Sequence, residues 1–247
     1  MKPSILVPSV FMLCALALWE GWVRVFNVPV YLLPSPSAII KSVEPGLAVD
    51  MAVTLGEALA GFALASTIAF GCALLFANSR TLERGLFPFA IALKTTPLVA
   101  IAPLLVLWMG TGWWSKITAA ALISFFPVLV NTVKGLKAAD AECHELFKSL
   151  KASRTQEFLK LRIPFSLPYL FSALKISSSL AIVGAVVGEF VGATRGVGYL
   201  IMVSSSHLDT DILFSAIFAS ALSGMILFQI LGYIERKVVF WHRLDSE

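Results

Sequence analysis

The sequence predicts an all-α polytopic membrane protein with about six transmembrane helices. Of its 247 residues, 58% are hydrophobic and 14% are charged, and the mean hydropathy is +0.86. This balance lies far outside that of soluble domains. The apolar residues form long runs that are almost free of charge, as transmembrane helices require. Lys and Arg gather in the short polar segments between these runs, as they do in the cytoplasmic loops of membrane proteins.

The first span is expected over residues 5–25, with Trp19 and Trp22 as interfacial aromatic residues near its end. Only Lys2 precedes this run, and no small-residue cleavage site follows it. We therefore expect a retained helix and not a removed signal peptide.

The segment 26–50 is rich in proline and is expected to be a periplasmic loop. It should contain one short helix over residues 37–43, because Ser35 and Pro36 form a helix start signal.

Five further spans are expected, over residues 58–79, 85–115, 117–133, 163–188 and 212–234. The run 85–115 is longer than one straight crossing and contains prolines, among them Pro97, so this helix is expected to be bent or interrupted. The whole chain, residues 1–247, is then a single transmembrane domain.

The distribution of cations predicts the orientation. With the amino terminus inside, the only Lys and Arg outside are Arg24, Lys41, Lys116 and Arg195, and only Lys94 and Lys175 lie within spans. The others fall in cytoplasmic segments. By the positive-inside rule both termini are expected in the cytoplasm.

One long polar segment, residues 136–164, interrupts the apolar pattern. Its second part, Glu145–Pro164, carries several cations, while apolar residues recur at helical spacing. This pattern predicts a short amphipathic helix pair that docks against another surface.

The same segment resembles the EAA motif of ABC-importer permeases, in which Glu-Ala-Ala, three residues, Gly, nine residues, Ile, one residue, Leu and Pro follow one another. The matching positions are Glu145, Leu161, Ile163 and Pro164. Three positions depart from the motif: Leu146 and Phe147 replace the alanines, and Lys151 replaces the glycine. The resemblance implies a cytoplasmic coupling loop that contacts an ATPase through Glu145, Leu146, Phe147, Leu150, Lys151, Ala152, Ser153, Arg154 and Pro164.

Lys151 leaves two structures open. In a left-handed turn it would carry strain of about 1 kcal/mol or more. In one continuous helix it would carry none.

Short motifs elsewhere, such as Leu33–Ser37 (LPSPS) and Gly196–Leu200 (GVGYL), extend the resemblance to nearly the whole chain. They resemble the permeases of the nitrate, sulfonate, taurine and bicarbonate importer family, whose relatives import thiamine-precursor pyrimidines and riboflavin. The resemblance implies a type I (MetI-like) importer fold in the bacterial inner membrane and a permease homodimer. Its implied partners are two ATPase subunits, which hold ATP and Mg, and a periplasmic or lipid-anchored substrate-binding protein. The expected function is import of a small anion, such as nitrate, a sulfonate or taurine, or of a vitamin-precursor pyrimidine.

Candidate pathway or gating residues are Lys94, Pro97, Gly188, Glu189 and Gly192. An acidic residue at the end of a span, such as Glu189, is a functional candidate, although it could also reach the outer surface. Gly184, Gly188, Gly192 and Gly196 recur every four residues, which favours close helix packing or, alternatively, a seam that opens.

The sequence argues against several other functions. It contains no phosphate-binding loop, so the chain is not expected to hydrolyse ATP. It has no metal-ligand spacing and no nucleophile and base pattern, so neither a metal nor a resident cofactor is expected. Its cations lie between apolar spans, which indicates the lipid bilayer and not nucleic acid. The alternative function is an ion-coupled secondary transporter, for which paired intramembrane carboxylates and an internal repeat would be expected.

Overall fold

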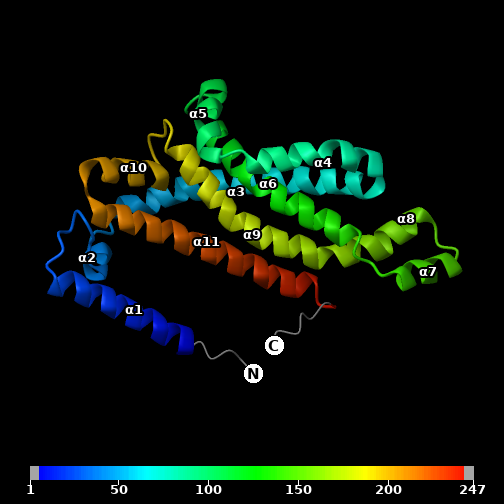
Figure 1. The fold of residues 1–247 in the computed structure, drawn as a ribbon, viewed down its shortest axis with the longest axis horizontal. Helices are drawn as coiled ribbons and strands as arrows, with labels where there is room; N and C mark the ends of the chain where they lie inside the picture. The colour runs from blue at the N-terminus through cyan, green and yellow to red at the C-terminus, as the bar shows by residue number, and fades with distance from the viewer. Residues whose placement is uncertain (1–5, 242–247) are drawn as a thin grey trace.

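Long helices lying side by side form an elongated bundle in the computed structural model, which describes residues 6–241 (Figure 1). Among these residues there is no β-strand. Lys2 and residue 5, the first residue of the first expected span, lie outside the described residues. Five helices have the length and apolar composition of membrane spans: α1 (Leu6–Val25), α3 (Pro45–Asn78), α6 (Trp113–Leu136), α9 (Ile163–Glu189, continuous with the preceding turn) and α11 (Thr210–Val238).

Two further helices together have the length and apolar composition of one broken span. α4 (Arg80–Thr95) and α5 (Leu98–Met109) meet at Pro97 and are bent by 98°. Proline has no N–H to donate and disfavours a helical conformation in the residue before it. The expected interruption of the third span is therefore confirmed, and so is the all-α fold of about six apolar helices.

Short helices lie at the two ends of the bundle (Figure 1). α7 (Ala141–Ser149) and α8 (Arg154–Glu157) mark what we call the coupling end. α2 (Pro36–Lys41) and α10 (Val197–His207) mark what we call the distal end. The Ser35 side chain accepts a hydrogen bond from Ala38 N–H and so caps α2, which confirms the predicted start of this helix.

The core forms where α6 packs between α3 and α9. Buried apolar residues fill this contact; near the coupling end they are Ala69, Ala73, Phe76, Val128, Leu129, Val133 and Leu136. Gly184 and Gly188 of α9 face α6 so closely that a Cβ on Gly184 would lie 2.7 Å from the Ala120 Cα atom. These two glycines therefore serve close packing, which favours the first of the two interpretations.

The other two glycines of that pattern are not on the helix. α9 ends at Glu189, and Gly192 and Gly196 have φ values of +79° and +115°. These positive φ values suit glycine, and both residues lie outside the helix: Gly192 is in the loop after α9, and Gly196 is the N-cap of α10. The prediction that four glycines share one helix face was therefore wrong for Gly192 and Gly196.

The second span also begins earlier than expected. α3 starts at Pro45 and not at residue 58, so the last six residues of the predicted 26–50 loop belong to this helix. Two acidic residues, Asp50 and Glu57, lie inside α3. Other parts of the chain contact both of them, and for this reason they do not end the helix.

Candidate functional site

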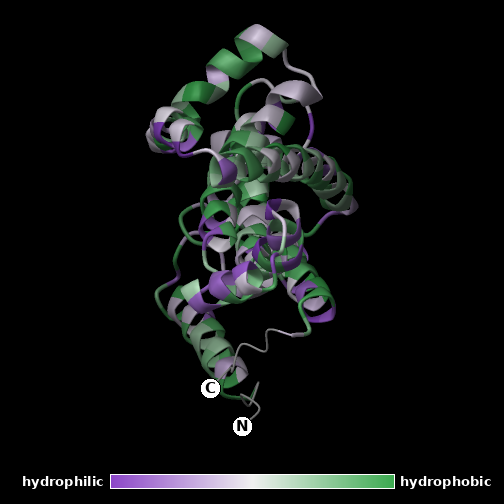
Figure 2. Cartoon of the chain, turned by 90° about the vertical axis from the view of Figure 1, so that its right-hand side faces the viewer, coloured by the Kyte–Doolittle hydropathy of each residue, from purple (hydrophilic) through white to green (hydrophobic). Residues whose placement is uncertain are grey.

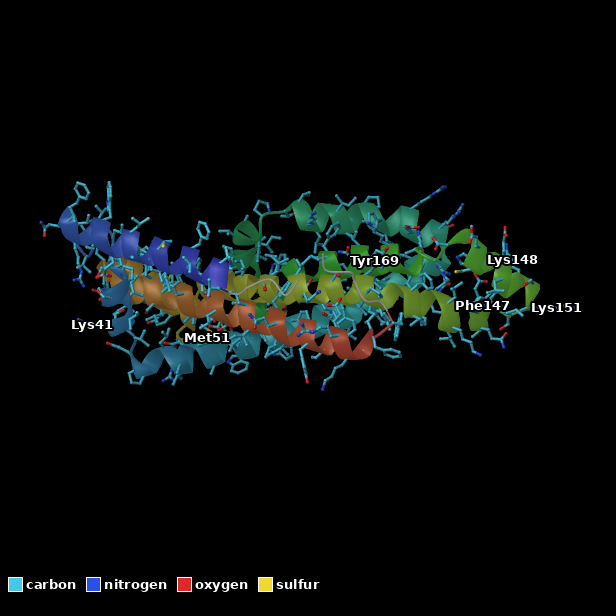
Figure 3. The ribbon with its side chains drawn as sticks, turned by 90° about the horizontal axis from the view of Figure 1, so that it is seen from below. Lys41, Met51, Phe147, Lys148, Lys151 and Tyr169 are labelled. Carbon is cyan, nitrogen blue, oxygen red and sulfur yellow. The ribbon has the colours of Figure 1, made fainter. Side chains whose placement is uncertain are left out.

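The predicted coupling residues lie together at the tip of the coupling end. α7 carries Glu145, Leu146 and Phe147; a turn carries Leu150, Lys151, Ala152 and Ser153; α8 begins at Arg154, and Pro164 lies in the first turn of α9. Figure 3 shows Phe147, Lys148 and Lys151 at this tip, with Lys41 and Met51 at the opposite end of the molecule. In Figure 2 the polar segment faces the viewer in front of the green spanning helices.

The α7–α8 segment presents an apolar surface. Leu146 and Leu150 are 57% and 69% exposed, while Phe147 between them is half-buried. Exposed leucines next to lysines form a small patch with a charged rim. Such a patch is typical of a surface that another protein covers.

Lys151 occupies the left-handed turn, with φ +49°. Ala152 N–H donates to Phe147 O at 3.0 Å and Lys151 N–H donates to Lys148 O at 2.9 Å. This pair of bonds is a Schellman motif, which satisfies carbonyl groups at the end of α7. Of the two structures left open for Lys151, the chain therefore adopts the turn.

One side-chain contact joins α7 to α8, and a capping box orders the start of α8. His144 Nδ1 lies 2.6 Å from Glu157 Oε1, so a pair of side chains joins the two short helices. The Ser153 hydroxyl accepts from Gln156 N–H, and Gln156 Oε1 accepts from Ser153 N–H at 2.8 Å. This capping box fixes the start of α8. The loop is thus a defined helical structure and not a flexible linker.

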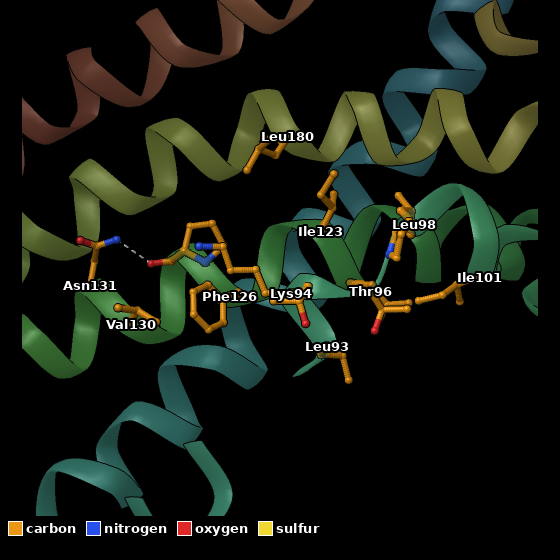
Figure 4. A pocket seen from close by; sticks show the side chains of 14 residues that line it. Leu93, Lys94, Thr96, Leu98, Ile101, Ile123, Phe126, Val130, Asn131 and Leu180 are labelled. Atoms are coloured by element: carbon orange, nitrogen blue, oxygen red, sulfur yellow. Dashed lines mark hydrogen bonds between the residues drawn. The ribbon is translucent and has the colours of Figure 1, made fainter. Parts of the chain in front are cut away.

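A second group of predicted residues, Lys94 and Pro97, lines a cavity of about 560 Å³ between the α4–α5 joint, α6 and α9 (Figure 4). Lys94 Nζ lies 4.8 Å from the centre of the Phe126 ring. Asn131 also faces the cavity, and its Nδ2 atom donates to Pro127 O at 2.9 Å. The walls are mostly apolar, with one cation, one amide and one aromatic ring as specific features.

Glu189 does not face this cavity or the surface. Its side chain is 0% exposed, and it lies with Glu57 (3%) and Lys116 (2%) at the distal end. Glu189 Oε1 accepts from the Thr54 hydroxyl at 2.6 Å, and Oε2 accepts from Gly198 N–H at 2.5 Å. The idea that Glu189 reaches the outer surface was therefore wrong, because α3 and the start of α10 supply its partners.

The rest of this buried cluster consists of Glu57 and Lys116. The Glu57 carboxyl lies against that of Glu189, and its Oε2 atom has no hydrogen-bond partner among the described residues. Lys116 donates to the carbonyls of Thr111 and Gly112 and is electrostatically attracted to both carboxylates. The cluster joins α3, α6 and α9, and it also reaches the loop before α6.

Sequence reasoning missed this cluster. Lys116 was placed outside the membrane, and Glu57 falls just before the span expected over residues 58–79. The signal was present, however, because the expected topology brings the beginnings of the second and fourth spans and the end of the fifth to one side of the membrane. Of the pathway candidates, then, Lys94 and Pro97 share the cavity, Gly188 and Glu189 belong to the distal end of α9, and Gly192 lies in the loop beyond.

Comparison with known proteins gives consistent results. The family of binding-protein-dependent transport system inner membrane components matches residues 65–240. The formylaminopyrimidine transport permease protein ThiX of Halalkalibacterium halodurans is 34% identical, over 96% of each chain. The riboflavin transport system permease protein RibX of Chloroflexus aurantiacus is 36% identical, over 97% of this chain and 91% of its own. Less similar relatives are permeases named for aliphatic sulfonates, taurine and nitrate.

The fold matches solved transporters. An amino acid ABC transporter crystallised with histidines superposes with a TM-score of 0.66 at 15% identity, over 78% of this chain and 94% of that chain. At this identity the likeness concerns the fold alone.

Proposed function

We propose that α7 is the surface on which a cytoplasmic ATPase docks, because this chain belongs to the family of binding-protein-dependent transport system inner membrane components. It is thus an ABC-importer permease subunit. The observation that carries this proposal is the pair of exposed leucines, Leu146 in α7 and Leu150 in the turn that follows it, at the tip of the coupling end. An apolar anchor surrounded by charges supplies binding energy at its centre and selectivity at its rim.

The proposed assembly follows from membership of this permease family. Two copies of this chain form the pathway in the bacterial inner membrane, and two ATPase subunits hold ATP and Mg²⁺ on the cytoplasmic side. A periplasmic or lipid-anchored protein delivers the solute at the distal end. Closure of the ATPase pair moves α7 and opens the pathway alternately to the two sides, while this chain hydrolyses no ATP itself.

The cavity at Lys94 supports a proposal for the solute. Its volume of about 560 Å³ lies within the range of small-molecule sites. The Phe126 ring offers a stacking surface, and the Lys94 ammonium and the Asn131 amide offer donors to oxygen or nitrogen acceptors. We therefore propose a small planar heteroaromatic solute, in keeping with the names of ThiX and RibX, with small anions such as sulfonates as the alternative class.

One observation favours ion coupling. Glu57 and Glu189 form the buried carboxyl pair that a secondary transporter would be expected to contain. The family assigns ATP as the energy source, and the Glu189 carboxylate is held by Thr54 and Gly198. We therefore propose that this pair fixes the distal ends of the helices.

ATP hydrolysis tests the proposal. Purified alone in detergent, the chain is expected to show no hydrolysis above background, because its sequence has no phosphate-binding loop. Purified with its partner ATPase, the complex is expected to hydrolyse Mg-ATP. Turnover by the isolated polypeptide, or transport driven by a proton gradient without any ATPase, would refute the proposed mechanism.

A further inference from the structure

Arg162 lies where the polar loop becomes a spanning helix. It is the last residue of a π-helical turn, η1 (Phe158–Arg162), which leads directly into α9. Pro164 has no N–H, so the regular i→i−4 bonding pattern is interrupted at this point. Within the turn, Ile163 N–H donates instead to Phe158 O. Such wide turns often occur at functional sites.

The guanidinium group of Arg162 reaches the ends of two other helices. Nε donates to Leu136 O and Nη2 donates to Ala77 O, both at 2.9 Å. Leu136 is the last residue of α6, and Ala77 lies in the last turn of α3. The last carbonyls of a helix have no partner within it, and the macrodipole favours a cation there. One side chain thus satisfies carbonyls of two helices.

The planar shape of the group makes this double contact possible. Arginine has five donors in a rigid fork, whereas lysine has a compact ammonium on a flexible stem. The third contact, from Nη1 to Asn78 Oδ1, is longer at 3.5 Å. The centre of the Phe158 ring lies 5.4 Å from the guanidinium carbon, within the range of a cation–π contact.

The ion pair next to this site extends the connection. Lys137 follows Leu136 in the chain, and its Nζ atom lies 2.6 Å from Glu83 Oε1 in the first turn of α4. The coupling ends of α3, α4 and α6 are therefore joined to one another. α4 in turn leads to Lys94 and the cavity.

We propose that Arg162 is the positioning residue that clamps the α7–α8 segment to the ends of α3 and α6, so that a push on α7 moves these helices together with α9. This inference rests on the proposed docking of an ATPase at α7. Without the clamp, the movement would be carried by the covalent connections at residues 137–140 and at α9, and α3 would receive it only through side-chain packing.

The distance between α7 and α3 tests the clamp. Spin labels are attached at Ser149 of α7 and at Leu75 of α3, an exposed position, after the three native cysteines have been replaced. Pulsed electron paramagnetic resonance is recorded on the complex with its ATPase, first without nucleotide and then with Mg-ATP and vanadate. In the wild-type chain we expect the centre of the distance distribution to stay within about 2 Å between the two states, the scale of small helix shifts.

Two variants provide the comparison. Arg162→Lys keeps the charge but loses the fork, so its distribution should widen at least about twofold when nucleotide is added. Lys160→Gln changes an exposed cation of the same turn and should behave as the wild type.

Each outcome decides the inference. Identical distributions for Arg162→Lys and wild type would overturn it, and so would a larger shift in the wild-type pair. Loss of the ATPase from Arg162→Lys at unchanged thermal stability would also overturn it, because Arg162 would then belong to the docking surface. If Arg162→Lys does not fold, the distance between the two labels in the wild-type chain still tests the clamp, because a shift larger than about 2 Å would overturn it. A wild-type chain that binds no ATPase refutes the proposed function instead.

Discussion

Lys151 carries backbone strain that glycine would not. A side chain at φ +49° costs about 1 kcal/mol. We expect Lys151→Gly to raise the melting temperature in detergent by about 2–4 °C and to leave ATPase binding intact. Lys148→Gly, inside α7, is the matched control and should lower it, since glycine costs about 1 kcal/mol within a helix. An equal fall in melting temperature for Lys151→Gly and Lys148→Gly would contradict backbone strain in the turn at Lys151.

Glu189 is expected to stabilise the distal end through its two acceptor atoms. In Glu189→Gln the amide oxygen still accepts from Thr54, but the amide nitrogen then faces Gly198 N–H. Leaving such buried groups unpaired costs about 1–3 kcal/mol, so we expect the melting temperature to fall by about 2–10 °C. Glu44→Gln, at an exposed position without a side-chain cap bond, should change it little. A Glu189→Gln protein as stable as wild type would show that these bonds contribute nothing.

At the scale of single helices, α7 is expected to bind by its apolar side. Leu150→Ala removes an anchor and should reduce the ATPase that co-purifies with the chain about tenfold, a loss of about 1.4 kcal/mol. Phe147→Ala should have a similar effect, because this half-buried ring lies next to Leu146 in α7 and belongs to the same apolar side. Lys148→Ala should mainly change the dependence of binding on salt. If Leu150→Ala and Phe147→Ala both retain the ATPase at wild-type levels, α7 is not the docking helix.

The elements that the sequence predicted best are those set by local composition. Long apolar runs mark the spans, and Pro97 marks the 98° bend. The start of α3 was missed because the prolines of the 26–50 segment suggested a loop, and because the span was placed on the charge-free run 58–79, which follows Asp50 and Glu57. Their partners lie far away in sequence: Asp50 accepts from Gly196 N–H, and Glu57 lies against Glu189. Charges satisfied by such distant groups leave no local signal.

The site residues were likewise predicted where the signal lies within one short segment, and missed where it depends on distant parts of the chain. The coupling loop was recognised from a motif within one short segment, and only the choice between turn and helix at Lys151 needed the structure. Arg162 was counted as one more cytoplasmic cation. Its contacts with Leu136 and Ala77 join segments that are 26 and 85 residues away, which no spacing in the sequence indicates.

At the scale of the whole molecule, docking of an ATPase at α7 requires that the coupling end faces the cytoplasm. Most cations lie in segments that share the side of residues 136–164, and only a few lie in the segments of the other side. The positive-inside rule therefore predicts α7 in the cytoplasm, where ATP and the ATPase are found. α2 and the distal end then face the periplasm.

Accessibility to an impermeant maleimide measures this orientation directly. Single cysteines are introduced at Ser153 in the coupling loop or at Lys41 at the distal end, both exposed, in a chain without Cys14, Cys72 and Cys143. We expect Lys41→Cys to react in intact spheroplasts and Ser153→Cys to react only after the membrane has been opened. Reaction of Ser153→Cys from outside, with Lys41→Cys protected, would place α7 away from ATP and contradict its role as the docking surface.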